Sequence, residues 1–557
     1  MRLPVGLSDF QSLVKEDYIF ADKSLFIKEI MDDGAKIILI PRPRRFGKTL
    51  NLSMLSYFFK IDTDHTLFDN LLISKDASFC TKHQNQYPVI FVSFKDIKES
   101  SYLGAYKEIR LLISGLYSEH RYLLEGDVLT DDEKRTFTQI INKEAEPEEI
   151  KDSLKQLTIF TARKFGKNPV LLIDEYDTPI QEAYLRGYYS EMIDIMRGML
   201  GKVLKDNIYL TKAVLTGITR VSQESMFSGL NNVEVYSLLR EEYGQYFGFT
   251  EEEVVKLIKD TKQEIDLEPI KEWYNGYQVG KYVLYNPWSI INCLKNHGKL
   301  QPYWLNTSSN DLIAKLLTNA NIEIKHQFEE LLQGNIIERA LAENLVFMDI
   351  EKREDALWSL LLYAGYLKVL SSELVDYNLI ARMSIPNKEV SFVYARIVRE
   401  WFSSAISIDA YSRFVESLAS SNMEKFKLYI STYIIQSGSY FDFNHNTPEQ
   451  IFHIFILGLV VGMRDRYVLS SNKESGFGRY DVMFIPKKLD LAGIILEFKV
   501  AKTPELLRER ANDALVQIKD MEYMSIFKSH NVKSVLAIGM SFCGKEMDMI
   551  HEVIDLL

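Results

Sequence analysis

The sequence predicts an α/β protein with a parallel sheet in its first half, a helical middle and a smaller α/β unit at its C-terminal end. Three observations support this. The apolar run 36–41 leads through a basic loop into residues 50–59, whose apolar residues have helical spacing. The run 169–175 is apolar until its final Asp-Glu, which is typical of a strand buried on both faces of a parallel sheet. The apolar strand predicted at 493–500, in the C-terminal part of the chain, contains two charged residues, Glu497 and Lys499.

Length and composition indicate a globular protein of roughly two to four domains. Hydrophobic residues make up 46% and charged residues 26% of the 557 positions. The net charge of −11 excludes a general nucleic-acid coat, so any contact with nucleic acid must come from a local basic patch. Cys80, Cys293 and Cys543 have no metal-binding spacing and fit a reducing interior.

Two further features predict a cytoplasmic location without membrane contact. The N-terminus lacks the apolar stretch of a signal peptide. The longest apolar run, 454–463, is too short to cross a bilayer.

The loop Arg42–Thr49 connects the strand and the helix of the first apolar pair. Backbone N–H groups and the positive end of a helix dipole bind phosphates at such a place. Lys48 is expected to reach the β and γ phosphates and Thr49 to hold Mg²⁺, as in a Walker A motif. The predicted nucleotide-binding residues of this loop are Arg44, Arg45, Phe46, Gly47, Lys48, Thr49 and Leu50.

One position departs from the usual Gly-x4-Gly-Lys-Ser/Thr pattern, because Arg42 replaces the first glycine. Glycine is used there since the chain turns sharply with positive φ. Arg42 therefore requires a turn that opens differently. The alternative is a plain basic helix start, but a helix N-terminus disfavours cations, so three arginines and Lys48 imply a strong anion.

The stretch "PRPRRFGKTLNLSMLSYFF", with "LSDF" and "YIFADKS" before it, resembles the AAA-ATPase-like family of bacterial and archaeal proteins. Its loop is similar to those of archaeal and STAND-type ATPases, and the family loop commonly lacks the first glycine. The resemblance implies a P-loop NTPase sheet, ATP with Mg²⁺, and a C-terminal PD-(D/E)XK nuclease-like domain. Asp22-Lys23 belongs to the same resemblance, and we expect it to be a surface charge pair.

The run 169–175 reads as a Walker B strand. Asp174 is expected to hold the Mg²⁺ shell and Glu175 to act as general base on the attacking water. The alternative is a buried strand followed by an acidic loop. In this class of ATPase a polar residue on the neighbouring strand senses the γ-phosphate, and Thr216, at the end of the apolar run 208–216, fits that place.

Arg220 follows this strand as a candidate charge sensor or a finger for a neighbouring subunit. The alternative for Arg220 is a surface salt bridge. A further strand is predicted at 87–94, and mostly helix over 98–165, with a helix start at 146–149.

The middle region is rich in aromatic residues. Thr250 and Glu253 form a capping box at a helix start. A hairpin is expected between 273–277 and 286–294, because Asn275-Gly276 is a turn signal. This part resembles the family's lid region, and a lid over nucleotide and plain interdomain packing both stay open. We expect domains at 1–240, 241–400 (helical lid and winged-helix-like connection) and 401–557.

The C-terminal unit contains a constellation of charges. Glu449 lies in the first turn of an apolar helix, where the dipole also favours an acid. Asp481 lies in an alternating strand, and Glu497 and Lys499 project from one face of the next strand. Charges in so apolar a strand are costly unless they bind something. Asp481 and Glu497 are expected to meet and hold a divalent metal, with Lys499 stabilising reacting charge.

This Asp…Glu-x-Lys pattern resembles the PD-(D/E)XK nucleases, although Tyr480 replaces the usual proline. The resemblance implies a restriction-endonuclease-like α/β domain. It makes Asp481 and Glu497 ligands of Mg²⁺ or Mn²⁺, Lys499 the catalytic lysine and Glu449 the helix acid. Gln517, with Tyr523, matches the later helix.

Together these features predict an ATP-hydrolysing protein joined to a Mg²⁺-dependent nuclease that cleaves DNA, in defence or mobile-element control. A homo-oligomer is compatible with this function. The alternative is an ATP-driven, STAND-like switch or scaffold whose nuclease fold binds nucleic acid or protein without cutting.

Overall fold

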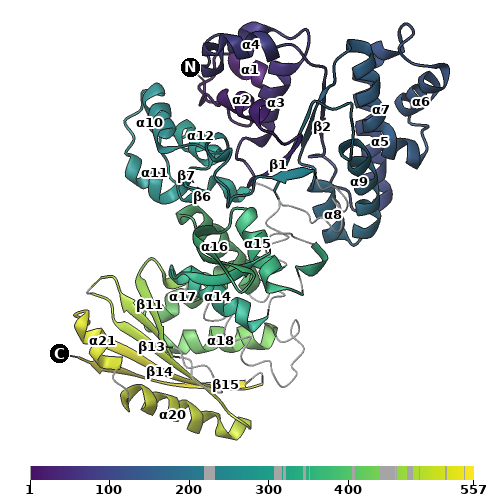
Figure 1. Cartoon of the computed structure of the whole chain (residues 1–557). Helices are drawn as coiled ribbons and strands as arrows, with labels where there is room; N and C mark the ends of the chain where they lie inside the picture. The colour runs from purple at the N-terminus through teal and green to yellow at the C-terminus, as the bar shows by residue number, and fades with distance from the viewer. Residues whose placement is uncertain are drawn as a thin grey trace. The chain divides into compact units, whose positions relative to one another are not determined.

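The computed structural model describes residues 2–218, 232–306, 316–317, 321–342, 347–350, 352–403, 408–437, 458–459, 461–472, 481–488, 490–520, 523–544 and 546–556. The chain divides into two compact units, each described separately below (Figure 1). The first comprises Met1–Leu312 and Glu338–Val390, and the second comprises Ile313–Ile337 and Ser391–Leu557. The division at 240 and 400 expected from the sequence stays a prediction. In the described part of the chain no helix has the length and apolarity that crossing a membrane requires.

The first unit is built on a five-stranded sheet of order β2-β3-β4-β1-β5. Every neighbouring pair is parallel, which confirms the parallel sheet predicted from the sequence. Strands β1, β3 and β4 are buried along their whole length, as the apolar runs require. The strands are β1 (Ile37–Pro41), β2 (Val89–Ser93), β3 (Val170–Asp174), β4 (Lys212–Gly217) and β5 (Val233–Val235).

Two groups of helices accompany this sheet. In Figure 1 the purple helices α1 to α4 and the blue helices α5 to α9 lie on either side of β1 and β2. The first group is α1 (Phe10–Lys15), α2 (Leu25–Asp32), α3 (Lys48–Phe59) and α4 (Ala77–His83). The second is α5 (Tyr102–Glu119), α6 (Asp131–Asn142), α7 (Pro147–Phe165), α8 (Thr178–Arg186) and α9 (Tyr189–Leu204). The helices expected over 98–165 are therefore confirmed, including the start at Pro147.

The strand order brings the loops that follow β1, β3 and β4 to one edge. Ile40 pairs with Thr216, and Ile173 pairs with Leu215. Carboxyl ends of adjacent parallel strands form the edge where ligands bind in such sheets. The loop before α3 and the acidic residues after β3 therefore share one site.

A group of helices and one hairpin completes this part of the unit: α10 (Glu251–Asp260), α11 (Leu267–Tyr274), β6 (Tyr277–Val279), β7 (Tyr282–Leu284) and α12 (Pro287–Lys295). The capping box of Thr250 and Glu253 is confirmed, since both reciprocal hydrogen bonds are formed. The hairpin is also confirmed, but its turn is Gly280-Lys281 and not Asn275-Gly276. Asn275 instead ends α11, and Gly276, with φ of 102°, redirects the chain into β6.

A three-stranded sheet of order β8-β10-β9 lies further along the chain. Its strands β9 and β10 are antiparallel. The elements here are β8 (Ile337–Leu341), α15 (Glu354–Tyr363), β9 (Lys368–Val375) and β10 (Asn378–Ser384). Helix α14 (Ile322–Gln333), and helix α16 (Lys388–Ser403) from Ser391 onward, belong to the second unit. The winged-helix-like character expected for this region stays a prediction.

The second unit contains a mixed five-stranded sheet of order β11-β12-β13-β14-β15. Only β13 and β14 pair in parallel, and helices α20 and α21 connect them, as a parallel pair requires. The strands are β11 (Tyr467–Asn472), β12 (Asp481–Pro486), β13 (Gly493–Val500), β14 (Ser534–Cys543) and β15 (Glu546–Asp555). Besides α14 and most of α16, the described helices of this unit are α17 (Ile408–Ala419), α18 (Met423–Ser437), α20 (Leu507–Asp520) and α21 (Tyr523–Ser529).

Helix α20 packs closely on β14 through a glycine. A Cβ added at Gly539 would lie 2.2 Å from the carbonyl oxygen of Ala511 and 2.6 Å from the backbone nitrogen of Leu515. No side chain fits in that space, so Gly539 fixes how near the helix lies to the sheet. The C-terminal α/β unit predicted from the sequence is thereby confirmed.

Candidate nucleotide site and candidate metal site

The loop between β1 and α3 turns at two left-handed residues, Arg45 with φ of 67° and Gly47 with φ of 81°. Gly47 is the N-cap of α3, which begins at Lys48. Arg42 is not among the residues with positive φ. The turn therefore opens differently from a glycine-first loop, as the arginine at this position requires.

Arg42 points into the protein. Its guanidinium donates hydrogen bonds to the carbonyl oxygens of Pro41 at 2.9 Å and Tyr236 at 2.7 Å, and it lies 5.3 Å from the ring centre of Phe247. The side chain is fully buried, and burial lowers its pKa to about 9. Arg42 therefore does not belong to the set of cations that we expected to face an anion, because backbone carbonyls solvate its charge instead.

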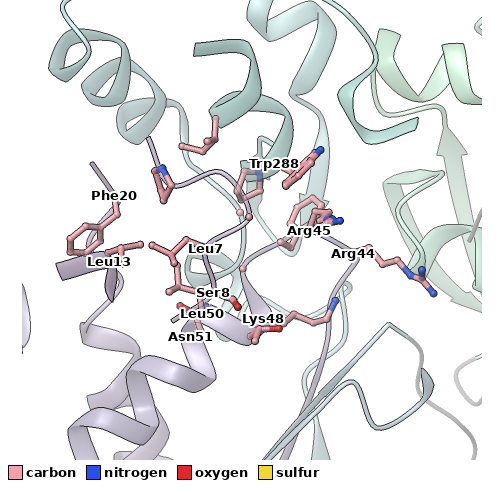
Figure 2. A pocket seen from close by; sticks show the side chains of 18 of the residues that line it. Leu7, Ser8, Leu13, Phe20, Arg44, Arg45, Lys48, Leu50, Asn51 and Trp288 are labelled. Carbon is pink, nitrogen blue, oxygen red and sulfur yellow. The ribbon is translucent and has the colours of Figure 1, made fainter. Parts of the chain in front are cut away.

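Lys48 lies under the loop. Its ammonium donates to the carbonyl oxygens of Arg42 at 3.1 Å and Pro43 at 3.0 Å. Only 4% of the residue is exposed, and burial lowers its pKa, opposed by the charges of Glu175 and Asp174. The lysine is thus held by weak carbonyl acceptors beside the start of α3 (Figure 2).

Asp174, at the end of β3, is the centre of the polar cluster. Its Oδ2 accepts hydrogen bonds from the hydroxyls of Thr49 at 2.8 Å and Ser93 at 3.2 Å, and its Oδ1 accepts from Thr216 at 2.8 Å. The carboxyl is fully buried, so desolvation, followed by the charge of Glu175, raises its pKa. Three residues that the sequence singled out, Thr49, Asp174 and Thr216, are therefore in direct contact.

Ser93 was not singled out from the sequence. The signal for it was its place at the end of β2, one strand from Asp174, where a hydroxyl reaches the same edge.

Glu175 follows directly in a left-handed conformation, with φ of 49°. Its Oε2 accepts a hydrogen bond from Thr178 at 3.2 Å, and its carboxylate lies on the wall of the cavity that Lys48 and Arg45 also line. Glu175 therefore lies next to the loop and remains partly exposed, whereas Asp174 is buried.

A second acid after β3, Asp177, is linked to the loop through Gln181. Its Oδ2 accepts from the backbone N–H of Ile218 and from the Gln181 amide, both at 2.9 Å. Gln181 in turn accepts from the Arg44 guanidinium at 3.3 Å. The network holds Arg44 against α8. No local sequence pattern indicates this contact, because Gln181 lies 137 positions from Arg44.

Arg45 and Phe46 contact the segment that follows the sheet. The Arg45 guanidinium lies 4.2 Å from the ring centre of Trp288, a cation–π contact, and its pKa is lowered by burial (Figure 2). The Phe46 ring is buried edge-on against Tyr277 at 4.9 Å. The aromatic-rich segment is therefore attached to the loop itself.

A cavity of about 360 Å³ opens over this loop. Its walls come from the N-terminal segment 4–23, the loop 44–51, residues 95–98, the segment 246–249 and the start of α12. Figure 2 shows Leu7, Leu13 and Phe20 on one side and the cationic side chains of the loop on the other. The cavity therefore combines an apolar wall with a charged one, and its size is within the range of small-molecule sites.

Lys23 also lines this cavity and overturns one expectation. Its ammonium forms an ion pair with Glu253 at 2.6 Å and donates to the carbonyl oxygen of Gln245 at 2.6 Å. Its neighbour Asp22 accepts from the backbone N–H groups of Ser24 at 2.9 Å and Leu72 at 2.7 Å. Asp22-Lys23 is not a surface charge pair, because both side chains bind partners that are distant in sequence.

In the second unit, three of the predicted nuclease residues lie close together: Glu497, Lys499 and Gln517. The backbones of Asp481 and Glu497 pair directly across β12 and β13. The Glu497 side chain is fully buried, and its Oε1 lies 3.6 Å from the ammonium of Lys499, which confirms that the two share a face. Lys499 also donates to the amide oxygen of Gln517 on α20. Tyr523 is buried at the start of α21.

Other predicted residues fall outside this description. Arg220 and Glu449 lie outside the described residues, as does the side chain of Asp481. In the part of the chain that the structure describes, no three His, Cys, Asp or Glu residues gather as metal ligands. Binding of a divalent metal by Asp481 and Glu497 therefore stays a prediction.

Comparisons with known proteins give the following findings. The family described as "Predicted AAA-ATPase" matches residues 4–227, and the "PD-(D/E)XK nuclease superfamily" matches residues 447–552. An uncharacterised protein in the vnfD 5′ region of Azotobacter chroococcum mcd 1 is 24% identical, over 100% of this chain and 99% of that protein. The Walker-type ATPase PABY2304 of Pyrococcus abyssi is similar at 13% identity and a TM-score of 0.32, over 67% of this chain and 94% of that chain.

These matches agree with the two sheets described above. The first covers the loop, the parallel strands β1 to β4 and Asp174, and the second covers β11 to β14 and most of β15. The chain accordingly carries a domain of the predicted AAA-ATPase family followed by a domain of the PD-(D/E)XK nuclease superfamily.

Proposed function

We propose that this protein binds and hydrolyses ATP at the loop 44–50 and cleaves DNA with a Mg²⁺-dependent nuclease site in its C-terminal domain. The observation that carries the first half is the contact of Thr49 and Thr216 with the buried Asp174, beside Lys48. A hydroxyl at the helix start and an acid at the strand end are the oxygen ligands that Mg²⁺ takes in such ATPases.

Two protein ligands suit Mg²⁺, which also binds water and phosphate oxygens, better than they suit a metal that takes all of its ligands from protein side chains. Thr49 and Asp174 supply one hydroxyl and one carboxylate, 2.8 Å apart. Mg²⁺ commonly binds through one or two protein groups and fills its other positions with water and substrate phosphates. When bound, the ion neutralises charge on the phosphates.

Each polar residue around the loop has a separate role in binding or hydrolysing ATP. Lys48 exchanges two neutral carbonyl acceptors for anionic phosphate oxygens, a stronger hydrogen bond. Glu175, at the cavity wall, accepts the proton of the attacking water. Thr216 orients the Asp174 carboxylate from the neighbouring strand, where it responds to the γ-phosphate. Arg220 is proposed as a further charge sensor.

The nuclease half rests on the cluster around Lys499. Glu497 and Asp481 are proposed to hold Mg²⁺ or Mn²⁺, and Lys499 to stabilise charge on the reacting phosphate. Gln517 holds the lysine by accepting its hydrogen bond, and Glu449 is the proposed fourth participant. DNA as substrate, a cytoplasmic location, a homo-oligomeric state and a role in defence or mobile-element control belong to the same proposal.

ATP binding and hydrolysis by three forms of the protein test the first half. Lys48→Ala is expected to lose tight binding, because the phosphates lose their cation. Glu175→Gln is expected to bind ATP normally and to hydrolyse it at least a hundredfold more slowly, since removing a general base costs about 10²–10⁴ in rate. Equal ATP affinity of wild type and Lys48→Ala would contradict the assignment of the loop.

Plasmid cleavage with Mg²⁺ or Mn²⁺ tests the second half. Asp481→Asn, Glu497→Gln and Lys499→Met are each expected to lose cutting. Lys519→Met is the matched control, because Lys519 forms an exposed ion pair with Glu552 on the same domain. A wild type that binds ATP but cuts no nucleic acid with either metal would favour a switch or scaffold instead of a nuclease.

A further inference from the structure

The ion pair of Lys23 and Glu253 joins two segments that are 230 positions apart in the chain. The Lys23 ammonium contacts both oxygens of the Glu253 carboxylate, at 2.6 and 2.7 Å, and the carbonyl oxygen of Gln245. Only 11% of the lysine side chain and 23% of the glutamate side chain are exposed. Such a pair is screened by water much less than the half-exposed pairs elsewhere on this domain.

Both segments contribute to the apolar wall of the cavity over the loop. Ile19, Phe20 and Ala21 line the cavity directly before Lys23. Tyr246 and Phe249 line it directly after Gln245. The ion pair therefore joins two segments that both line the cavity, and Lys23 is itself a lining residue.

Each partner is also fixed from outside the pair. Asp22 binds the backbone of Leu72 and Ser24, which anchors the first segment. Glu253 accepts a hydrogen bond from the backbone N–H of Thr250 at 2.9 Å, which ties it to the start of α10. The ion pair therefore links two segments that are each held in place by further hydrogen bonds.

We infer that Lys23 and Glu253 are positioning residues that hold the apolar walls of the cavity together around the base of a nucleoside triphosphate. The inference rests on the proposed ATP site. The cations of the loop take the triphosphate, and the paired segments take the base, since apolar and aromatic walls bind a flat ring by burying it. Binding of the base depends on the ion pair, whereas binding of the phosphates does not.

Two probes separate the roles: ATP with Mg²⁺, and inorganic triphosphate with Mg²⁺, which has no base. Lys23→Met is expected to weaken ATP binding at least tenfold and triphosphate binding less than twofold. Lys48→Ala is expected to weaken both. Lys28→Met is the matched control, because Lys28 pairs with Asp76 in the same N-terminal region but does not line this cavity. It is expected to change neither.

Two further variants exclude a general effect of an unpaired buried charge. Lys23→Arg keeps the pair and is expected to retain ATP affinity within threefold. The double variant Lys23→Met/Glu253→Gln removes both charges and keeps an acceptor for Thr250. It is expected to show the same selective loss of ATP as Lys23→Met.

The inference is overturned if Lys23→Met leaves ATP affinity unchanged, weakens both probes equally, or fails to fold while the double variant binds ATP like wild type. Failure of the proposed function has a different signature, because Lys48→Ala would then bind both probes as well as wild type does.

Discussion

The hydroxyl of Thr216 donates a hydrogen bond to Oδ1 of Asp174 at 2.8 Å, while the other oxygen of the same carboxylate is bound by hydroxyls from α3 and β2. All of the donors are neutral. A buried carboxylate with neutral donors keeps much of its desolvation penalty, and the nearby charge of Glu175 adds to it. The charged form of this acid is therefore costly to the folded protein without ligand, and a bound cation would offset that cost.

Asp174→Asn should stabilise the protein without ligand. A carboxyl whose folded pKa is raised keeps its proton longer in the folded state, so its contribution to stability falls as pH rises from 3.8 through the folded pKa. At pH 7.5 we therefore expect the asparagine variant to have a higher Tm than wild type in the absence of ligand. The stabilisation by Mg²⁺ with ATP should be lost. Differential scanning calorimetry with and without Mg²⁺ and ATP measures both.

Asp194→Asn provides the control for that measurement. Asp194 is an acid on α9 that pairs with Lys151 at 2.8 Å, and its pKa is lowered by that hydrogen bond. Its removal should not raise the Tm. A lower Tm for Asp174→Asn in the absence of ligand would contradict the cost assigned to this carboxyl.

Arg42→Met should destabilise the protein. The variant keeps much of the apolar volume but leaves the carbonyls of Pro41 and Tyr236 without their donor. An unsatisfied buried acceptor costs about 1–3 kcal/mol. Arg42→Gly, which restores the usual first glycine of the loop, should be less stable still, because it also leaves a cavity. Urea unfolding of the two variants tests this order, and an Arg42→Gly as stable as wild type would contradict it.

Glu389→Gln should change how stability depends on pH. Glu389 accepts hydrogen bonds from the Ser289 hydroxyl at 2.7 Å and the Trp304 backbone at 2.8 Å, and burial raises its pKa to about 7. The charged form is therefore disfavoured in the folded state, and this contribution to stability falls as pH rises from 4.5 to 7. At pH 8 the cost is about 3 kcal/mol.

The glutamine variant should thus be more stable than wild type at pH 8 and equal to it near pH 4.5. Thermal unfolding across this range measures the difference. Glu272→Gln is the control, since Glu272 pairs with Lys388 at the surface. Parallel pH curves for wild type and Glu389→Gln would show that the carboxyl is not held neutral.

ATP binding should alter the nuclease activity of the full chain. A ligand shifts an arrangement only by its differential affinity for two states. We expect Glu175→Gln, which holds ATP without hydrolysing it, to change the cleavage rate or DNA affinity by at least about fivefold, or about 1 kcal/mol of coupling. The double variant Lys48→Ala/Glu175→Gln should show no such change. Equal rates with and without ATP would mean that the two domains work independently.

The parts of the fold predicted correctly share one property, which is that their signal is local. Apolar runs mark β1, β3 and β4, and the capping box marks α10, because each depends on residues within a few positions. Thr49, Asp174 and Thr216 could be singled out for the same reason, since each ends or begins a strongly patterned element. Their roles stay a prediction.

The parts that were missed or wrong depend on partners that no local pattern reveals. Lys23 looks like a surface residue until Glu253 is placed beside it. The hairpin turn was assigned to Asn275-Gly276 because that pair is a frequent turn, whereas the glycine in fact redirects the chain after α11. Trp288 shows its relation to Arg45 only in three dimensions.

The buried guanidinium of Arg42 also sets an order of events during synthesis. Its acceptor at Tyr236 lies 194 positions further along the chain, and the edge strand β5 that pairs with β1 ends at Val235. A nascent chain that has reached only residue 227, where the ATPase family match ends, has neither. The loop 42–49 therefore cannot reach its final geometry until the ribosome has released residues 233–236, so this domain completes its fold late in synthesis.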